Sequence, residues 1–335
     1  MSLFHSHFHG PRRLARRSFM FLGAGAGLTG AVRRPRPKEP EPLPVAAKVE
    51  APPPDPKEAP PTRSSPASPA PIFDAHLHCP SENGMLWQWH PVTKTFEEFM
   101  AYLDRTGVNR GIINSVRCQL AKTPADFIAG NREVARYVEK YKGRLLGACV
   151  VNPLFIDESL REIEECHKQF GFVWVGELCN YTVPYQYTIK EFELLVEQVV
   201  KLNMVLDVHT GLREMEYIIQ KFPKATIVFP HFTDEHGYNS IFKRIDAVAA
   251  NANCYLDTSG FGIDRMGMLE CAIKAIGPDR VLFGSDFSIN DPSTVIARIQ
   301  NSFLTEEEKG KVLEGNLVAL LKKVAPDIDK QVGFA

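Results

Sequence analysis

The chain has 335 residues, of which 44% are hydrophobic, and a formal net charge of −1 at pH 7. This composition fits one large globular unit with some unfolded chain, and the near-neutral charge excludes the basic surface of a nucleic-acid-binding protein. The seven cysteines are odd in number and form no Cys-x-x-Cys pair, so neither a disulfide framework nor a cysteine zinc site is indicated.

Residues 1–33 are similar to a bacterial twin-arginine export leader. The pair Arg16-Arg17 follows a basic stretch and precedes a weakly apolar run, rich in Gly and Ala, that is too short for an ordinary membrane span. The resemblance implies export by a bacterium, with the twin-arginine machinery as a partner and a periplasmic location. No small-x-small cleavage site follows, so a membrane tether through an uncleaved leader is an alternative, as is a basic disordered tail.

Residues 34–71 differ sharply in composition, because they hold 14 of the chain's 25 prolines, mixed with Lys, Glu, Ala and Ser. Such a segment buries too little apolar surface to offset the entropy of ordering it. We therefore expect a disordered, proline-rich linker. A ligand for proline-recognition modules is the functional alternative.

The run Ile72–His78 is the first segment with a strand pattern. Alternate side chains of a strand share a face, which predicts one face with Asp74, His76 and His78 and the other with Phe73, Ala75 and Leu77. Two imidazoles that point the same way can hold one divalent ion. Two partly exposed histidines in a loop are the alternative.

Strand-like and amphipathic helical runs then alternate to the end of the chain. Eight such units in residues 72–335 predict an α/β fold of the (β/α)8 TIM-barrel type. An open doubly wound sheet is disfavoured because no Gly-rich phosphate loop follows the first strand. The expected strands are Ile72–His78, Gly111–Ser115, Leu145–Val151, Val173–Leu178, Val205–His209, Thr226–His231, Cys254–Thr258 and Val281–Ser285. The expected helices are Thr95–Thr106, Ala125–Tyr141, Ile156–Phe170, Ile189–Leu202, Leu212–Phe222, Ser240–Asn251, Asp264–Ile276 and, closing the last unit, Glu306–Val324.

Polar residues end five of the expected strands. Active sites of such barrels lie at the carboxyl ends of the strands, so these positions are candidates for catalysis or metal binding. A satisfied polar residue at the barrel rim is the alternative for any one of them. The six candidates are His76, His78, Glu177, His209, His231 and Asp286.

These motifs together resemble the amidohydrolase-related family over residues 72 to about 324. The resemblance rests on Asp74-x-His76-x-His78, His209-Thr210-Gly211, His231, Gly284-Ser285-Asp286 and Gly315-Asn316-Leu317-x-x-Leu320-Leu321. Members are metal-dependent barrels, mostly hydrolases, with a branch of non-oxidative decarboxylases that includes aminocarboxymuconate semialdehyde decarboxylase. The resemblance implies that His76, His78 and His209 bind metal, that Asp286 is a ligand or proton shuttle, and that His231 is a second-metal ligand or stabilises the transition state.

Glu177 stands where many two-metal relatives carry a carboxylated lysine. A glutamate can bridge two cations, but one ion with Glu177 beside its ligands or on the substrate is equally compatible. The expected cofactor is therefore a divalent metal, most simply Zn²⁺, as one or two ions.

Hydrolysis of an amide, ester or lactone of a small molecule is the expected reaction. Zn²⁺ would activate a water and polarise the carbonyl, while Asp286 would carry the proton. A metal-dependent decarboxylase of a small carboxylic acid and a non-catalytic metal- or ligand-binding barrel are the alternatives, and a homo-oligomer is possible. Candidates for the substrate wall are Trp87, Trp89, His90, Tyr181, Tyr185, Arg213 and His236.

Overall fold

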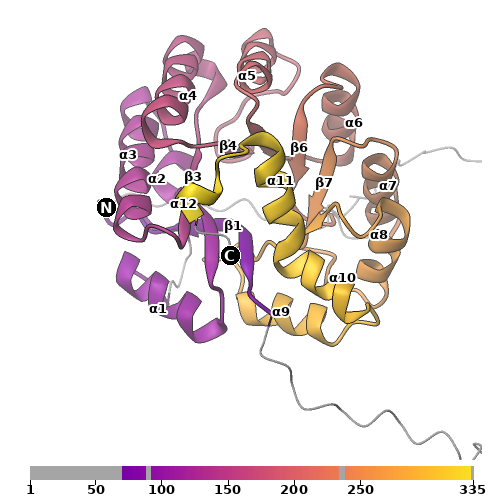
Figure 1. Ribbon diagram of the computed structural model, residues 1–335. Helices are drawn as coiled ribbons and strands as arrows, with labels where there is room; N and C mark the ends of the chain where they lie inside the picture. The colour runs from indigo at the N-terminus through magenta and orange to yellow at the C-terminus, as the bar shows by residue number, and fades with distance from the viewer. Residues whose placement is uncertain (1–69, 88–91, 234–237, 333–335) are drawn as a thin grey trace, which may run out of the picture. The chain divides into compact units, whose positions relative to one another are not determined.

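Eight parallel strands pair in sequence order in a computed structural model that describes residues 70–87, 92–233 and 238–332. The edge strands meet as well: the Ala75 N–H donates to the Phe283 carbonyl (2.9 Å) and the Asp286 N–H to the His76 carbonyl (3.0 Å). The predicted (β/α)8 barrel is therefore confirmed (Figure 1). Its strands are β1 (Phe73–Cys79), β2 (Arg110–Ser115), β3 (Leu145–Cys149), β4 (Trp174–Cys179), β5 (Val205–His209), β6 (Thr226–Phe229), β7 (Cys254–Asp257) and β8 (Val281–Leu282).

Helices alternate with the strands and surround them (Figure 1). Several begin at capping boxes, in which a threonine side chain and an acidic residue three positions later satisfy each other's backbone N–H groups, as at Thr95 with Glu98 and Thr305 with Glu308. The helices are α1 (Phe96–Thr106), α2 (Val116–Gln119), α3 (Pro124–Lys140), α4 (Ile156–Phe170), α5 (Lys190–Lys201), α6 (Leu212–Lys221), α7 (Tyr238–Ala249), α8 (Met268–Ile276), α9 (Pro292–Gln300), α10 (Glu306–Gly310), α11 (Asn316–Val324) and α12 (Asp329–Val332).

Two apolar layers hold the barrel together. One lies between the strands and the surrounding helices and contains Leu77, Val175 and Leu206. The other fills the amino end of the barrel interior, where Phe73 and Trp174, the first residues of their strands, pack with Leu320 and other side chains of α11. Helix α11 therefore covers the amino end of the barrel, and Figure 1 shows it crossing in front of the strands.

Two sequence predictions are wrong in detail. The pairing of β1 with β2 is irregular between Asp74 and Leu77, so Leu77 lies in the outer layer while Phe73 and Ala75 lie in the inner one. A strict period of two cannot anticipate such a shift. The expected helix Glu306–Val324 is interrupted by a π-helical turn at Lys311–Gly315, and α9, which lies near α1, is the helix that follows β8.

The leader and most of the linker lie outside the described residues, so the predictions for residues 1–69 are not tested by the structure. In the described part of the chain, every helix is too short or too polar to span a bilayer.

Candidate metal centre

The six strand-end candidates converge at the carboxyl end of the barrel. His76 and His78 belong to β1, Glu177 to β4 and His209 to β5, while His231 and Asp286 follow β6 and β8. Five of the six are buried, and His209 is partly exposed. Their ligating atoms form two groups of three, one with His76, His78 and Asp286 and the other with Glu177, His209 and His231.

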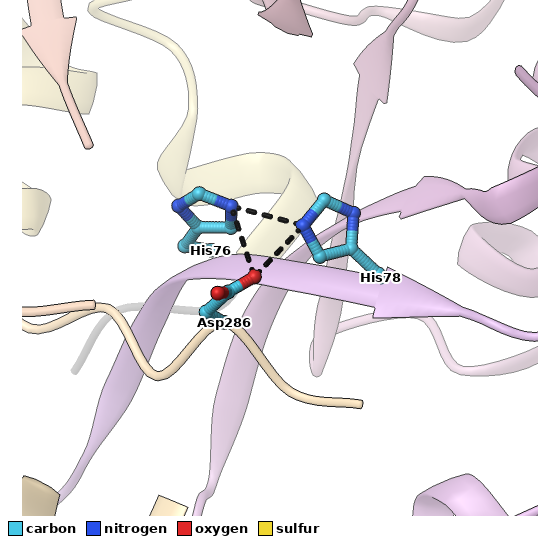
Figure 2. Close-up of side chains that lie close together, drawn as sticks. All are labelled: His76, His78 and Asp286. Atoms are coloured by element: carbon cyan, nitrogen blue, oxygen red, sulfur yellow. Dashed lines mark hydrogen bonds and ion pairs between the residues drawn. The ribbon is translucent and has the colours of Figure 1, made fainter. Parts of the chain in front are cut away.

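The first group has the spacing of ligands around one ion. The Nε2 atoms of His76 and His78 are 3.1 Å apart, and Oδ1 of Asp286 lies 3.0 Å from the second and 3.7 Å from the first. Figure 2 shows the two rings turned toward each other with Asp286 beside them. Ligands held at about 2.1 Å from a common ion lie about 3 to 3.5 Å from one another. Two of the three distances fall in this range, and the distance from Asp286 to His76 is slightly longer.

Glu177 joins the two groups. Its Oε2 lies 3.4 Å from the Nε2 atoms of both His76 and His78. Its Oε1 lies 2.7 Å from Nδ1 of His209 and 3.8 Å from Nε2 of His231. The family resemblance implied that His209 shares an ion with His76 and His78, but the geometry groups it with Glu177 and His231. One carboxylate thus contacts both groups, which is compatible with one ion or with two.

Hydrogen bonds on the far side of two rings fix which nitrogen is available for an ion. Nδ1 of His76 lies 3.0 Å from Oδ2 of Asp257, and Nδ1 of His78 lies 2.9 Å from Oδ1 of Asn114. Gln119 Nε2 donates to the same Asn114 oxygen (3.3 Å), which identifies that atom as the acceptor. Because each Nδ1–H donates outward, Nε2 is the nitrogen of each ring that is available to bind an ion.

The charges of the centre call for a cation. Burial raises the pKa of Glu177, but His76 and His209 outweigh it and hold that pKa well below its usual range. Burial lowers the pKa of His76, but Glu177 and Asp257 outweigh it and raise that pKa well above its usual range. Every ion pair described for Glu177, Asp257 and Asp286 is with histidine. In the metal-free protein, protonated histidines supply the positive charge that balances these carboxylates. A divalent cation would replace that charge, so the donor set fits such an ion.

The residues after β6 and β8 adopt an unusual backbone conformation. His231 has φ 65° and Asp286 has φ 61°, both in the left-handed region that favours glycine. Asn290 lies one turn beyond Asp286 and donates from Nδ2 to its Oδ2 (2.9 Å), which leaves Oδ1 facing His76 and His78. Gly284 permits the approach of β8, since a Cβ there would lie 2.9 Å from the Asp257 carboxyl carbon.

A cavity of about 320 Å³ lies over the centre. Its lining combines polar groups of the centre with aromatic and apolar walls, among them Trp87 and Tyr181. Trp87 stacks on His78 with the planes 8° apart, and Tyr181 meets His209 edge to face. The full lining is Trp87, Tyr181, His209, His231, Gly260, Phe261, Asp286, Ile289 and Asn290.

The remaining predicted wall residues lie elsewhere. Arg213 is exposed at the start of α6 and Tyr185 is buried, and neither lines this cavity. Trp89, His90 and His236 fall outside the described residues, so their roles stay predictions.

Sequence reasoning missed residues that support the ligands. Asp257 ends β7 just as Glu177 lies near the end of β4, so the strand-end rule identifies it. Ser259, Asn114 and Asn290 carry no comparable signal, because single hydroxyl and amide side chains are common in loops. Asp74, predicted to share the histidine face, instead accepts from the backbone N–H groups of His76 (2.9 Å) and Ser285 (3.0 Å).

Comparison with known proteins gives one family and a set of structural relatives. A family model described as amidohydrolase matches residues 73–323, and no curated protein sequence gives a significant match. The chain resembles 2,6-dihydroxybenzoate decarboxylase from Rhizobium, with TM-score 0.59, 16% identity, and coverage of 75% of this chain and 98% of that chain.

Two further relatives were solved with manganese. One is a dihydroxybenzoic acid decarboxylase from Polaromonas sp. JS666 with the inhibitor 2-nitroresorcinol (TM-score 0.57, 19% identity, 75% of this chain and 97% of that chain). The other is 5-carboxyvanillate decarboxylase from Novosphingobium aromaticivorans with 4-hydroxy-3-methoxy-5-nitrobenzoic acid (TM-score 0.62, 15% identity, 76% of this chain and 96% of that chain). At these identities the likeness shows the fold.

Proposed function

The chain belongs to the amidohydrolase family, and from that premise we propose that it is a metal-dependent, non-oxidative decarboxylase of a small aromatic carboxylic acid. In this reaction the carbon–carboxylate bond breaks, carbon dioxide leaves, and a proton takes its place on the carbon. The sequence favoured hydrolysis with decarboxylation as the alternative. The solved relatives support that alternative better, because the three described above are decarboxylases of aromatic acids.

The observation that carries the proposal is the pairing of an aromatic-walled cavity with proton-carrying groups at its base. Trp87, Tyr181 and Phe261 line the cavity together with Asp286 and His231. A volume of about 320 Å³ suits a single substituted ring. Flat aromatic walls favour a planar substrate, and the groups at the base lie where its reacting carbon would be held.

Each residue has a role that follows from its contacts. A divalent ion held by His76, His78 and Asp286, with Glu177 alongside, would act as a Lewis acid toward substrate oxygens. Asn290 holds one oxygen of Asp286 by a hydrogen bond, so that the other faces the imidazoles. Among the groups that line the cavity, His231 Nε2 and the Asp286 carboxylate can hold or move the proton that the carbon receives.

The test is product analysis with the metal-loaded full chain. Protein loaded separately with Mn²⁺ and Zn²⁺ is incubated in D₂O with 2,6-dihydroxybenzoate, 5-carboxyvanillate and related aromatic acids. We expect carbon dioxide release and one deuterium at the carbon that lost the carboxylate. Turnover of esters or lactones without carbon dioxide release would contradict the proposal.

Hydrolysis is the second candidate, and Glu177 is the observation that favours it. A carboxylate whose two oxygens face different ligand groups can bridge two ions, and paired ions are common in hydrolases. The same panel, extended to amides, esters and lactones in H₂¹⁸O, tests this candidate through ¹⁸O in the product. Stoichiometric metal without turnover of any panel member would favour a non-catalytic binding barrel.

We also propose that the leader directs export by the twin-arginine route, on the basis of Arg16 and Arg17 followed by a short apolar run. The periplasmic location and the machinery as a partner rest on this proposal alone. Replacing both arginines by lysine is expected to retain the protein in the cytoplasm, as measured by cell fractionation. Unchanged export of the double variant would overturn it.

A further inference from the structure

The side of His231 that faces away from the cavity is enclosed by the chain that follows β7. Nδ1 of His231 lies 2.9 Å from Oγ of Ser259, and the His231 backbone N–H donates to Oδ1 of Asp257 (3.1 Å). Gly260 lies against the same ring edge, because a Cβ there would fall 2.2 Å from Nδ1. Residues at and just after the end of β7 thus hold both the backbone and the ring of His231.

The direction of the hydrogen bonds around Ser259 follows from proton counting. The Ser259 hydroxyl contacts Oδ1 of Asp257 at short range and the Ser259 backbone N–H donates to the same oxygen (2.9 Å). Oδ1 of Asp257 also accepts from the backbone N–H of His231 (3.1 Å), so two backbone donors identify this oxygen as an acceptor. Its short contact with the Ser259 hydroxyl therefore uses the hydroxyl's single proton, which Ser259 donates to Asp257. Ser259 Oγ must then accept from His231, and His231 Nδ1 carries a hydrogen.

We propose that Ser259 is a positioning residue that fixes His231 as the Nδ1–H tautomer, so that Nε2 presents a lone pair to the cavity. Asp257 serves two imidazoles through its two oxygens: Oδ2 accepts from His76 and Oδ1 accepts from Ser259, which holds His231. The same carboxylate therefore sets the orientation of an expected metal ligand and of an expected proton carrier. Asp257 also accepts from the backbone N–H of His231, the residue whose φ lies in the left-handed region.

The fixed tautomer defines what His231 can do to a bound molecule. A bare Nε2 accepts a hydrogen bond and is the one ring position where a proton can be added. When a proton taken up there passes to the substrate carbon that loses carbon dioxide, the ring returns to the Nδ1–H form. This last step rests on the proposed decarboxylase function, whereas the tautomer does not.

The first test observes the tautomer directly. Full-length protein labelled with ¹⁵N-histidine is loaded with diamagnetic Zn²⁺, and long-range ¹H–¹⁵N spectra are recorded before and after chelation of the metal. The His231 signals are assigned by their absence in His231→Gln. We expect a protonated Nδ1 and an unprotonated Nε2 in the parent under both conditions. In chelated Ser259→Ala, we expect the Nε2–H tautomer to become the main form.

Thr258→Val is the matched control for loss of a buried hydroxyl. Thr258 is as buried as its neighbour Ser259, but its hydroxyl bonds with backbone groups of Gly284. This variant should keep the parental His231 tautomer. If Ser259→Ala does not fold, Ser259→Cys, with a thiol that accepts weakly, should show a mixture of tautomers. The proposal would be overturned if His231 of the parent protein carried its hydrogen on Nε2. It would also be overturned if His231 kept its hydrogen on Nδ1 in chelated Ser259→Ala.

The second test is kinetic and uses whichever substrate the panel identifies. Ser259→Ala is expected to lower kcat about 10- to 100-fold, the usual effect of removing a residue that orients an active-site imidazole, while KM stays within about twofold. Thr258→Val should stay within about threefold of the parent in kcat. If no panel member turns over, the proposed function fails while the tautomer measurement still decides this inference. Parental kcat in Ser259→Ala with an active parent would refute the positioning role.

Discussion

The two ends of this barrel are built from the same strands but differ in chemistry. At the amino end, Phe73 and Trp174 pack against Leu320 of α11 in a cluster of hydrophobic side chains. At the carboxyl end, buried charged and polar groups such as Glu177 and Asp286 converge under an aromatic-walled cavity. Burying apolar surface stabilises the fold, whereas burying carboxylates costs free energy unless each is paired. The amino end therefore stabilises the fold, and this stability offsets the free-energy cost of the buried charged groups at the carboxyl end.

Backbone conformation shows the same contrast. In the described part of the chain, the non-glycine residues with φ in the left-handed region are Asn203, His231 and Asp286, and two of these belong to the candidate centre. Such conformations cost about 1–3 kcal/mol each. They persist because neighbouring strands and hydrogen bonds hold them. Variants at the two ends should consequently fail in different ways.

The largest effect is expected from removing the imidazoles of β1. His76→Ala combined with His78→Ala should remove the ion held by His76, His78 and Asp286 and abolish turnover, because this group loses two of its three donors. Metal analysis and activity are measured on the same folded preparation. Full metal content in the double variant would contradict the assignment of the centre.

Asp286→Asn tests whether the carboxyl end performs proton transfer. The amide keeps the size of the carboxylate but loses its charge and its ability to carry a proton, so turnover should fall about 10²- to 10⁴-fold. Metal should largely remain on the histidines, and the melting temperature should change little. Activity within about threefold of the parent, equivalent to about 0.6 kcal/mol of barrier, would remove Asp286 from the mechanism.

Leu320→Ala tests the amino end. Leu320 is 1% exposed in the cluster beneath the barrel, and truncation of a buried leucine costs about 2–5 kcal/mol through lost burial and a cavity. Chemical denaturation should show this loss, while activity per folded molecule stays close to the parent. Lys322→Ala, an exposed position on the same helix, is the control and should change stability by less than about 0.5 kcal/mol. A fall in specific activity of folded Leu320→Ala would break the separation of the two ends.

The smallest effect concerns Asp207, which lies between the two ends. Burial raises the pKa of Asp207 from 3.8 to about 8, and Trp174 Nε1 donates to its Oδ2 (3.0 Å). Between those two values the folded protein holds more protons than the unfolded chain, so the free energy of unfolding falls as pH rises. Asp207→Asn lacks that titration, and its stability relative to the parent should increase from pH 5 to pH 9. Melting curves of metal-free protein measure this, and a constant difference across that range would contradict it.

The fold was predictable from the sequence because the apolar patterns of both the strands and the amphipathic helices are strong in this chain. Strand β5 (Val205–His209) and helix α4 (Ile156–Phe170) match the expected ranges, since each apolar run is bounded by clear turn residues. The last segment was less predictable. The apolar pattern of Glu306–Val324 is continuous and gives no sign of the π-helical turn. It also does not show that α11 packs beneath the barrel, because that packing depends on residues of the strands.

The candidate centre was predictable as a set of residue types but not as a set of contacts. A polar residue after an apolar strand marks His231 or Asp286 without any three-dimensional information. The grouping of His209 with Glu177 and His231, rather than with His76 and His78, depends on side-chain geometry. The contact of Asp257 with His76 joins residues 181 positions apart, and no local pattern encodes it. The contacts that these supporting residues make are therefore visible only in the folded chain.

The seam between the first and last strands has a consequence for biosynthesis. Ser285 and Asp74 are hydrogen-bonded across it although they are 211 residues apart in sequence. His76 and His78 leave the ribosome long before Asp286, so the three donors can meet only once the whole barrel has been synthesised and has closed. Incomplete chains lack this set of donors. Capture of an ion by these three donors is therefore a late event, and metal bound by them identifies chains in which the barrel has closed.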